Sequence, residues 1–432
     1  MTMKLELLSK EVIRPVSLNH PQTLHLSLFD QFLPSTYVSA IFFYDDQANQ
    51  EILGQRLKNS LSQTLSLFYP LAGRIKEGVI VDCNDEGALF TEARANVLLS
   101  DVLRNPSDAG LVQKLIVSPD HADPETWPLL HVKVIFFRDR GFSVAVSVSH
   151  KICDATSLST FVRSWTKAAR GYVDNVNPEF AASVFYPPAD NSIEFPPLLV
   201  HETKSKTTRF VFGHLEIEKL KRRASGGKRV SQATRVESIT ALLLRCMTKA
   251  RRSKAGEVTE FAITQTMDLR PRVPFSLLPR KAIGNFFLPL LKESSESKME
   301  IQDTVSKLRK TKEELNELIT EDPEDAKVSS AGAKERIATA MLSSLCEVSP
   351  ETEAYVVSSW CRMSFYETDF GWGVPVWVAP DSVDKTHVVL MDANDGEGVE
   401  AWVTLPETDM AALEHDGELL FYATASPSVL LI

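Results

Sequence analysis

A histidine and an aspartate stand four residues apart at the end of an apolar run, in SVAVSVSHKICDATSLSTFVRSW. Valines alternate with small residues from 143 to 149, which predicts a buried strand. The alternation places His150 on the valine side, at the carboxyl end of that strand, where substrate-handling residues of sheets commonly project. A neutral imidazole can take a proton from a hydroxyl, thiol or amine near pH 7. The pattern therefore indicates general-base chemistry at His150.

Asp154 has three possible roles: it can cap the helix predicted to follow, pair with an arginine, or orient the His150 ring through a hydrogen bond. The spacing alone does not distinguish them. A metal held by His150 and Asp154 would lack a third ligand nearby, so no metal is expected. No GxSxG elbow precedes the pair, which argues against a serine hydrolase triad. Taken alone, the pair also fits a hydrogen-bonded core histidine.

A second stretch, SSWCRMSFYETDFGWGVPVWVAP, carries DFGWG at residues 369–373. HxxxD followed far downstream by DFGWG resembles the plant BAHD acyltransferases, CoA-dependent enzymes that acylate alcohols or amines. The segments LFYPLAGR at 67–74, MDLR at 267–270 and GNF at 284–286 are similar to further family segments. The resemblance covers essentially the whole chain, and SWCRMSFYETDFGWG looks closest to the branch of vinorine synthase-like alkaloid acetyltransferases. One departure is Ala155, where the family often has glycine.

These motifs must be positioned by the predicted strands and helices, which do not follow the regular βαβ alternation. This order predicts an α/β fold with mixed sheets. No GxGxxG or GxxxxGK[ST] phosphate loop is present. The resemblance implies a two-domain chloramphenicol acetyltransferase-like fold with a channel between the domains. We expect an N-terminal acyltransferase domain at 1–171 with HxxxD, a Pro-rich crossover at 172–207, and a C-terminal domain at 208–432 with DFGWG.

The resemblance also implies residue roles. His150 would be the general base that deprotonates the acceptor, with no covalent acyl-enzyme. Trp372 would donate its indole N–H to the oxyanion of the tetrahedral intermediate. Gly371 and Gly373 would be structural, and Phe370 would pack in the core.

Two structural ion pairs are implied as well. Asp154 would turn away from the channel and pair with an arginine. Arg270 of MDLR would pair with Asp369 of DFGWG. In both pairs the carboxylate holds a loop and does not take part in the chemistry.

Coenzyme A brings phosphate groups that need N–H donors and cations. The expected cofactor-side residues surround a predicted helix start with a capping box, and are Lys228, Arg229, Thr234, Arg235, Ser238 and Arg272. The expected acceptor-side residues are Ser35, Thr36 and Tyr37, together with Ser359 and Arg362. Phe68 and Tyr69 are expected to pack.

Composition limits the other partners. The chain has 432 residues, 44% of them hydrophobic, so it can bury sizeable cores. A net charge of −10 argues against nucleic acid and anionic membranes as partners. The five cysteines show no CxxC or Cys/His cluster, and no signal peptide or membrane span is expected. We therefore expect a cytosolic protein, and the family resemblance implies a monomer.

The sequence-based hypothesis is O-acetylation of a plant specialised metabolite, such as an alkaloid, from acetyl-CoA through a ternary complex. Malonyl-CoA or another acyl donor, or an amine acceptor, would suit the same residues. A member of the family that binds metabolites without catalysis is the alternative of another class. A metal-dependent hydrolase using His150 and Asp154 is the remaining one.

Overall fold

The computed structural model of the chain describes most of residues 3–429. It describes them except for 18–22, 47–48, 107–111, 113, 117–123, 140, 173–176, 181, 189–203, 227–229, 256–260, 274–277, 295–298, 321–334, 337–338, 341–352 and 382–385. Lys228, Arg229 and Cys346 lie outside the described residues.

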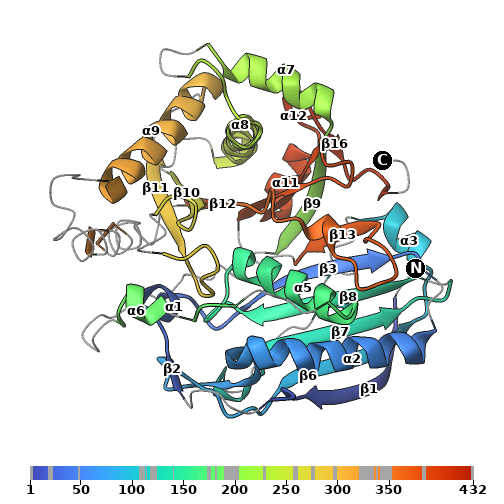
Figure 1. The fold of residues 1–432 in the computed structure, drawn as a ribbon. Helices are drawn as coiled ribbons and strands as arrows, with labels where there is room; N and C mark the ends of the chain where they lie inside the picture. The colour runs from blue at the N-terminus through green and yellow to red at the C-terminus, as the bar shows by residue number, and fades with distance from the viewer. Residues whose placement is uncertain are drawn as a thin grey trace.

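Among the described residues, six strands form the first sheet, in the order β1 (Leu5–Ile13), β6 (Ala88–Ala95), β7 (Leu130–Phe136), β8 (Phe142–Ser149), β3 (Tyr37–Tyr44) and β13 (Trp377–Pro380). The β6–β7 pair is parallel and the other pairs are antiparallel, so the sheet is mixed as predicted. Helices α2 (Gln50–Leu67) and α5 (Ala155–Ala169) lie side by side across one face (Figure 1). Every residue of β8 is buried, which accounts for its valines and small residues.

The second sheet has seven described strands, in the order β11 (Phe287–Ser294), β10 (Phe261–Asp268), β12 (Glu353–Ser359), β14 (His387–Asp392), β15 (Val399–Pro406), β9 (Ser205–Phe212) and β16 (Thr424–Ala425). The β10–β12 and β12–β14 pairs are parallel. Its outer face packs on α7 (His214–Ala224), α8 (Arg235–Ala255), α9 (Ile301–Thr320), α11 (Glu407–Leu413) and α12 (Gly417–Leu420), as Figure 1 shows.

Short elements complete the described fold. A small sheet has the order β2 (Thr23–His25), β5 (Ile80–Asp82) and β4 (Arg74–Lys76). The short helices are α1 (Leu28–Phe32), α3 (Leu99–Arg104) and α6 (Ala182–Phe185), with single 3₁₀ turns η1 (Tyr69–Ala72), η2 (Pro124–Thr126) and η3 (Phe365–Glu367). No helix in the described part of the chain combines the length and the apolar character needed to cross a membrane.

The two halves are joined by more than the crossover. Strand β13, from the expected C-terminal domain, pairs with β3 at the edge of the first sheet. The inner face of the second sheet also contributes Val389, Met391 and Trp402 to the core built around the first sheet. Since both halves share one apolar cluster, the inner face of the second sheet is turned toward the first domain.

A buried ion pair lies where β13 meets the second sheet. Arg209 of β9 and Glu400 of β15 are 0% and 3% exposed, with 2.9 Å between Arg209 Nε and the nearer Glu400 oxygen. The indole N–H of Trp377 in β13 donates to the same carboxylate at 3.4 Å. Burial raises the pKa of Glu400, and Arg209 opposes that effect. The hydrogen bond from Trp377 to Glu400 is therefore a polar link between the two sheets, and Arg209 holds the carboxylate in place.

We expect Arg209→Met to lower the free energy of unfolding by about 3–5 kcal/mol, because it leaves the Glu400 carboxylate buried and unpaired. Chemical denaturation would measure the loss. The double variant Arg209→Met/Glu400→Gln should recover most of it, since the amide carries no charge and still accepts from Trp377. A double variant no more stable than the single one would contradict this account.

Candidate active site

His150 follows the last residue of β8 and lies beside the start of β3. Its backbone N–H donates to the Thr36 carbonyl at 2.8 Å, and the register places Tyr37 opposite Ser149. The ring is half-buried, and its centroid lies 5.9 Å from that of Phe287 in β11. His150 therefore stands where a strand end of the first domain meets the second sheet, as the sequence predicts.

Asn285 fixes the tautomer of the His150 ring. The Asn285 Nδ2 group donates to an oxygen of Asp30 at 2.8 Å and to the His150 carbonyl at 2.7 Å. Both partners only accept at these atoms, so Asn285 Oδ1 must be the atom that lies 3.0 Å from His150 Nδ1. An amide oxygen can only accept, hence Nδ1 carries the proton of the neutral ring. The lone pair of the imidazole is then on Nε2, the nitrogen that can act as a base.

Asp30 anchors this arrangement from the first domain. It is buried in helix α1, where it shares a capping box with Ser27, and it accepts from both the backbone N–H and the side chain of Asn285. Burial raises the pKa of Asp30, and these hydrogen bonds oppose the rise. The GN turn in the sequence pointed to residue 285 without giving its role. No sequence signal marked Asp30, which is far from the other two along the chain.

The environment keeps His150 neutral. Burial lowers the pKa of His150 below its ordinary value, while the Asp154 carboxylate and the hydrogen bond with Asn285 act in the opposite direction. A lowered pKa means that the ring is largely unprotonated near pH 7, as a base requires.

Asp154 is structural and does not contact the His150 ring. It caps α5, accepting from the Ser157 N–H at 2.8 Å, and its two oxygens accept from Arg270 at 2.8 and 3.1 Å. The Phe286 N–H adds a bond at 3.1 Å. The pKa of Asp154 is lowered chiefly by Arg270, against the effect of burial. With both oxygens bound this way, Asp154 is not placed to share a metal with His150.

The expected partner of Arg270 is wrong. The Arg270 guanidinium binds Asp154 and Asp268, whereas Asp369 lies 3.6 Å from Arg170 at the end of α5. The Asp369 carboxylate instead folds its own loop, accepting from the N–H groups of residues 371 and 373 at 2.7 and 3.0 Å. Those two residues have φ of +107° and +102°, which explains why both are glycine.

The expected oxyanion role of Trp372 is also wrong. Its ring packs edge-on against Phe142 and Tyr44, with centroids 5.4 and 6.0 Å apart, and it stacks on the buried Phe370. Phe142 begins β8 and His150 follows its end, and eight residues of extended strand span about 26 Å. An indole near Phe142 cannot reach a carbonyl at His150. The DFGWG segment is therefore a structural loop at the far end of the strand.

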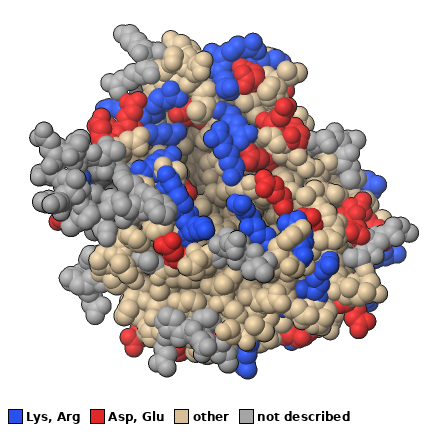
Figure 2. Space-filling view, in the orientation of Figure 1, with Lys and Arg blue, Asp and Glu red and all other residues tan. Residues whose placement is uncertain are grey.

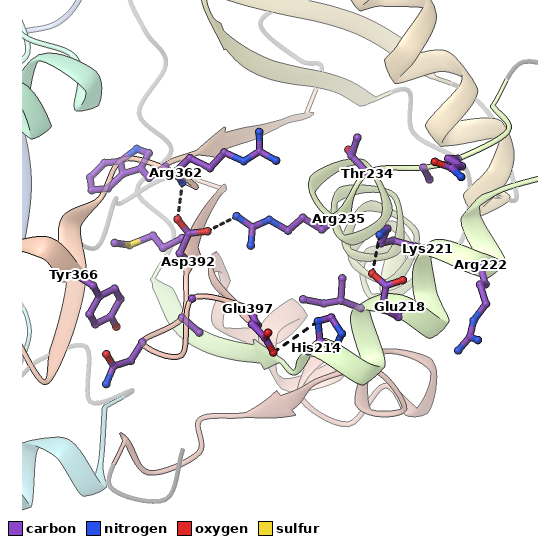
Figure 3. A pocket seen from close by; sticks show the side chains of 18 of the residues that line it. His214, Glu218, Lys221, Arg222, Thr234, Arg235, Arg362, Tyr366, Asp392 and Glu397 are labelled. Atoms are coloured by element: carbon purple, nitrogen blue, oxygen red, sulfur yellow. Dashed lines mark hydrogen bonds and ion pairs between the residues drawn. The ribbon is translucent and has the colours of Figure 1, made fainter.

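An open pocket of about 1400 Å³ lies beside the start of α8. It is lined by α7, by residues 231–235, by the loop after β12 and by the loop after β14 (Figure 3). His150 is not among its lining residues. Ser159 of α5 donates to the Met363 carbonyl at 2.6 Å, so the helix that follows His150 contacts the loop that borders the pocket. One face of the molecule is hollowed near its centre, with Lys and Arg side chains gathered around the hollow (Figure 2).

Of the expected cofactor-side residues, Thr234 and Arg235 line this pocket. Thr234 and Glu237 form the predicted capping box of α8. Ser238 is fully buried, bonded to the Thr234 carbonyl, and does not line the pocket, while Arg272 binds the Asp268 carbonyl.

The charges in the pocket are partly neutralised. Lys221 pairs with Glu218 at 2.7 Å, and Arg235 pairs with Asp392 (Figure 3). The side chains of Arg222 and Arg362 also line the pocket and form no ion pair with the described residues. Sequence reasoning missed Lys221 and Arg222, because nothing in the α7 sequence separates them from an ordinary solvated helix face.

The expected acceptor-side residues fall into two groups. Ser35, Thr36 and Tyr37 lie beside His150, and the Tyr37 hydroxyl donates to the Pro128 carbonyl at 2.6 Å. Ser359 ends β12, and Arg362 lies in the large pocket with Thr234 and Arg235. Phe68 is fully buried and Tyr69 is packed against the core, as expected.

Comparison with known proteins decides the family. The Transferase family model matches residues 3–420. The BAHD acyltransferase BIA1 of Arabidopsis thaliana is 43% identical over 99% of this chain and 100% of the relative. The chain belongs to the BAHD acyltransferase family. Stemmadenine O-acetyltransferase of Catharanthus roseus is 34% identical over 96% of this chain and 97% of the relative.

The crystal structure of vinorine synthase resembles this BAHD acyltransferase over its whole length. The TM-score is 0.83 with 32% identity, covering 99% of this chain and 100% of that chain. The expected fold class is therefore confirmed, and the protein is an acyltransferase.

We expect Asp154→Asn to lower the free energy of unfolding by about 3–5 kcal/mol, since it removes the charge that faces the buried Arg270 guanidinium. Asp369→Asn is the matched control. Its amide oxygen still accepts from the loop N–H groups, and its half-exposed pair with Arg170 is worth below about 1 kcal/mol. Denaturant unfolding of both variants checks the difference. If both variants lost the same free energy of unfolding, burial would not be the reason why the Asp154–Arg270 pair stabilises the fold.

Proposed function

We propose that this protein transfers an acetyl group from acetyl-CoA to a hydroxyl of a plant specialised metabolite. The observation that carries the proposal is the Asn285–His150 hydrogen bond, which leaves Nε2 of a neutral ring available as the base. The resemblance of the whole chain to an O-acetyltransferase supports the choice of acetyl group and hydroxyl. Malonyl or another acyl group, or an amine acceptor, would use the same base.

The reaction needs no covalent enzyme intermediate. His150 Nε2 takes the proton of the acceptor hydroxyl while its oxygen attacks the thioester carbonyl. The tetrahedral adduct then expels the sulfur of coenzyme A, and the protonated ring returns the proton to that thiolate. Asn285 Oδ1 accepts from Nδ1–H throughout, and it stabilises the imidazolium that forms in between.

The pocket beside α8 suits the phosphate end of the donor. Thr234 and Arg235 lie at the start of α8, where the positive end of the helix dipole favours an anion. Arg222 and Arg362 add guanidinium groups that can bind phosphate oxygens in bidentate fashion. On this proposal Arg362 serves the donor and not the acceptor. The pantetheine arm would lead past Trp360 toward His150.

The acceptor would then approach His150 from the side of Ser35, Thr36 and Tyr37. The proposal includes a monomer that works in the cytosol, as the sequence analysis expects. A protein that binds metabolites without catalysis is the competing candidate. The orientation of the ring by Asn285 argues against it, because a binding role gives no reason to present a free Nε2.

We expect His150→Ala to lower turnover at least about 10²-fold, because the acceptor loses its base. Release of free CoA from acetyl-CoA, measured with a panel of alcohols, gives the rate. Circular dichroism should show an intact fold, and His415→Ala, which removes an exposed histidine, should keep full activity. A well-folded His150→Ala enzyme with wild-type turnover would refute the assignment.

The pH dependence of kcat/KM should show a single acidic limb with its midpoint below the ordinary histidine pKa of 6.5. The base works only when unprotonated, so the rate rises as pH passes through the pKa of His150, and burial lowers that pKa. Initial rates with acetyl-CoA across pH 4.5–8 test this. A midpoint at or above 6.5 would contradict the buried, neutral base.

A further inference from the structure

Three neighbouring strands of the second sheet carry a connected set of polar side chains that the proposed reaction does not use. Thr266 of β10 donates to Ser358 Oγ of β12 at 3.1 Å. Ser358 Oγ lies 3.0 Å from Nε2 of His387 in β14. We call Thr266, Ser358 and His387 the polar row.

The polar row faces the first domain. Successive residues of a strand point to opposite faces of its sheet. Val357 and Val388 belong to the outer core of the second sheet, so their neighbours Ser358 and His387 are on the other face. Val389, two residues after His387, packs in the core of the first domain. All three residues of the row are half-buried, so part of their surface stays accessible between the domains.

The row continues away from the large pocket. Trp360 and Met391 line that pocket, at the ends of β12 and β14. Ser358 lies two residues before Trp360, and His387 lies four residues before Met391, which is about 13 Å of extended strand. Phe287, which contacts the His150 ring, is paired with Asp268, two residues beyond Thr266. Along these strands, Phe287, Trp360 and Met391 thus lie at about one level, and the polar row lies two to four residues farther from the pocket.

His387 is a neutral hydrogen-bonding group. Burial lowers the pKa of His387 to about 4, with a smaller contribution from the positive charge that His150 carries when protonated. Nε2 is bonded to Ser358, while Nδ1 has no hydrogen-bond partner among the described residues. A hydroxyl can both donate and accept, so it can bind Nδ1 in either tautomer of the ring.

We propose that the polar row is a binding site for a second hydroxyl group of the acceptor, with Nδ1 of His387 as the contacting atom. The inference rests on the proposed function and deepens it: the preferred acceptors carry one hydroxyl for acylation at His150 and another that binds His387. The row sets this preference through His387 Nδ1. A second hydroxyl on the acceptor forms a hydrogen bond with this nitrogen, whereas an apolar acceptor removes water from it and offers no hydrogen bond in return.

The test compares wild type, His387→Phe and His387→Asn with acetyl-CoA and matched pairs of rigid cyclic diols and their mono-alcohol analogues. Wild type should favour the diol in kcat/KM about tenfold in at least one pair, as one hydrogen bond allows. His387→Phe should lose that ratio with the mono-alcohol rate unchanged within about twofold. His387→Asn, whose amide can occupy the place of Nδ1, should keep part of it.

Thr404→Val is the matched control, because Thr404 lies opposite His387 on β15 but bonds to Thr207. It should leave the diol preference unchanged. Acetyl-CoA hydrolysis without an acceptor depends on the proposed function alone, so it should persist in His387→Phe and be lost in His150→Ala.

The outcomes separate the two proposals. The role of the polar row would be overturned if wild type shows no diol preference, or if His387→Phe keeps it. Provided that turnover still depends on His150, the proposed function would then stand. CoA release that does not depend on His150 would overturn both. If His387→Phe is unstable by thermal unfolding, His387→Leu takes its place with the same expected loss of ratio, because it also removes Nδ1.

Discussion

The buried pair of Asp154 and Arg270 is the interaction on which the site depends. Asp154 caps α5 in the first domain, and Arg270 follows β10 in the second. Their two hydrogen bonds join the helix start to the segment that connects β10 with β11, and the Phe286 N–H strengthens that connection. Because His150 precedes Asp154 by four residues and Asn285 precedes Phe286 by one, the same pair brings the ring and its partner together. Two charges buried together cost much to separate, so this geometry is fixed.

The position of the proton on His150 follows from the hydrogen bonds that connect Asp30, Asn285 and His150, because the atoms that Asp30 and Asn285 place in this chain can each act only as donor or only as acceptor. Asp30 can only accept, which orients the Asn285 amide, and the amide oxygen then places the proton of His150 on Nδ1. Burial raises the pKa of Asp30 and lowers that of His150, so both environments are water-poor. A histidine in such surroundings stays unprotonated near neutral pH, so Nε2 is free to accept a proton. Once the ring is protonated, the hydrogen bond to Asn285 stabilises its positive charge.

The arrangement of the second sheet gives the site two sides. The strand ends at Trp360 and Met391 open into a large pocket that holds the start of α8 and guanidinium groups. Farther back on the same face, Thr266, Ser358 and His387 offer uncharged hydrogen-bonding atoms. A charged donor and a neutral acceptor would therefore enter different electrostatic surroundings and meet near His150. The loop of residues 369–373 takes no part in this, because its carboxylate and its two left-handed glycines serve only to fold it.

The sequence determined the mixed α/β class, the strand that ends at His150, the capping box at Thr234 and the family resemblance, because these depend on local periodicity and on motifs that read along the chain. The spacing left the role of Asp154 open, whereas the resemblance implied its pair with an arginine, which the structure shows to be Arg270. The resemblance also assigned the wrong partner to Arg270 and the wrong role to Trp372. Only the tertiary structure showed that Asp30, Asn285 and His150 form one hydrogen-bonded chain, and that Thr266, Ser358 and His387 form another on the second sheet. Those residues come from separate elements, and no local pattern records which strands the folded sheets place side by side.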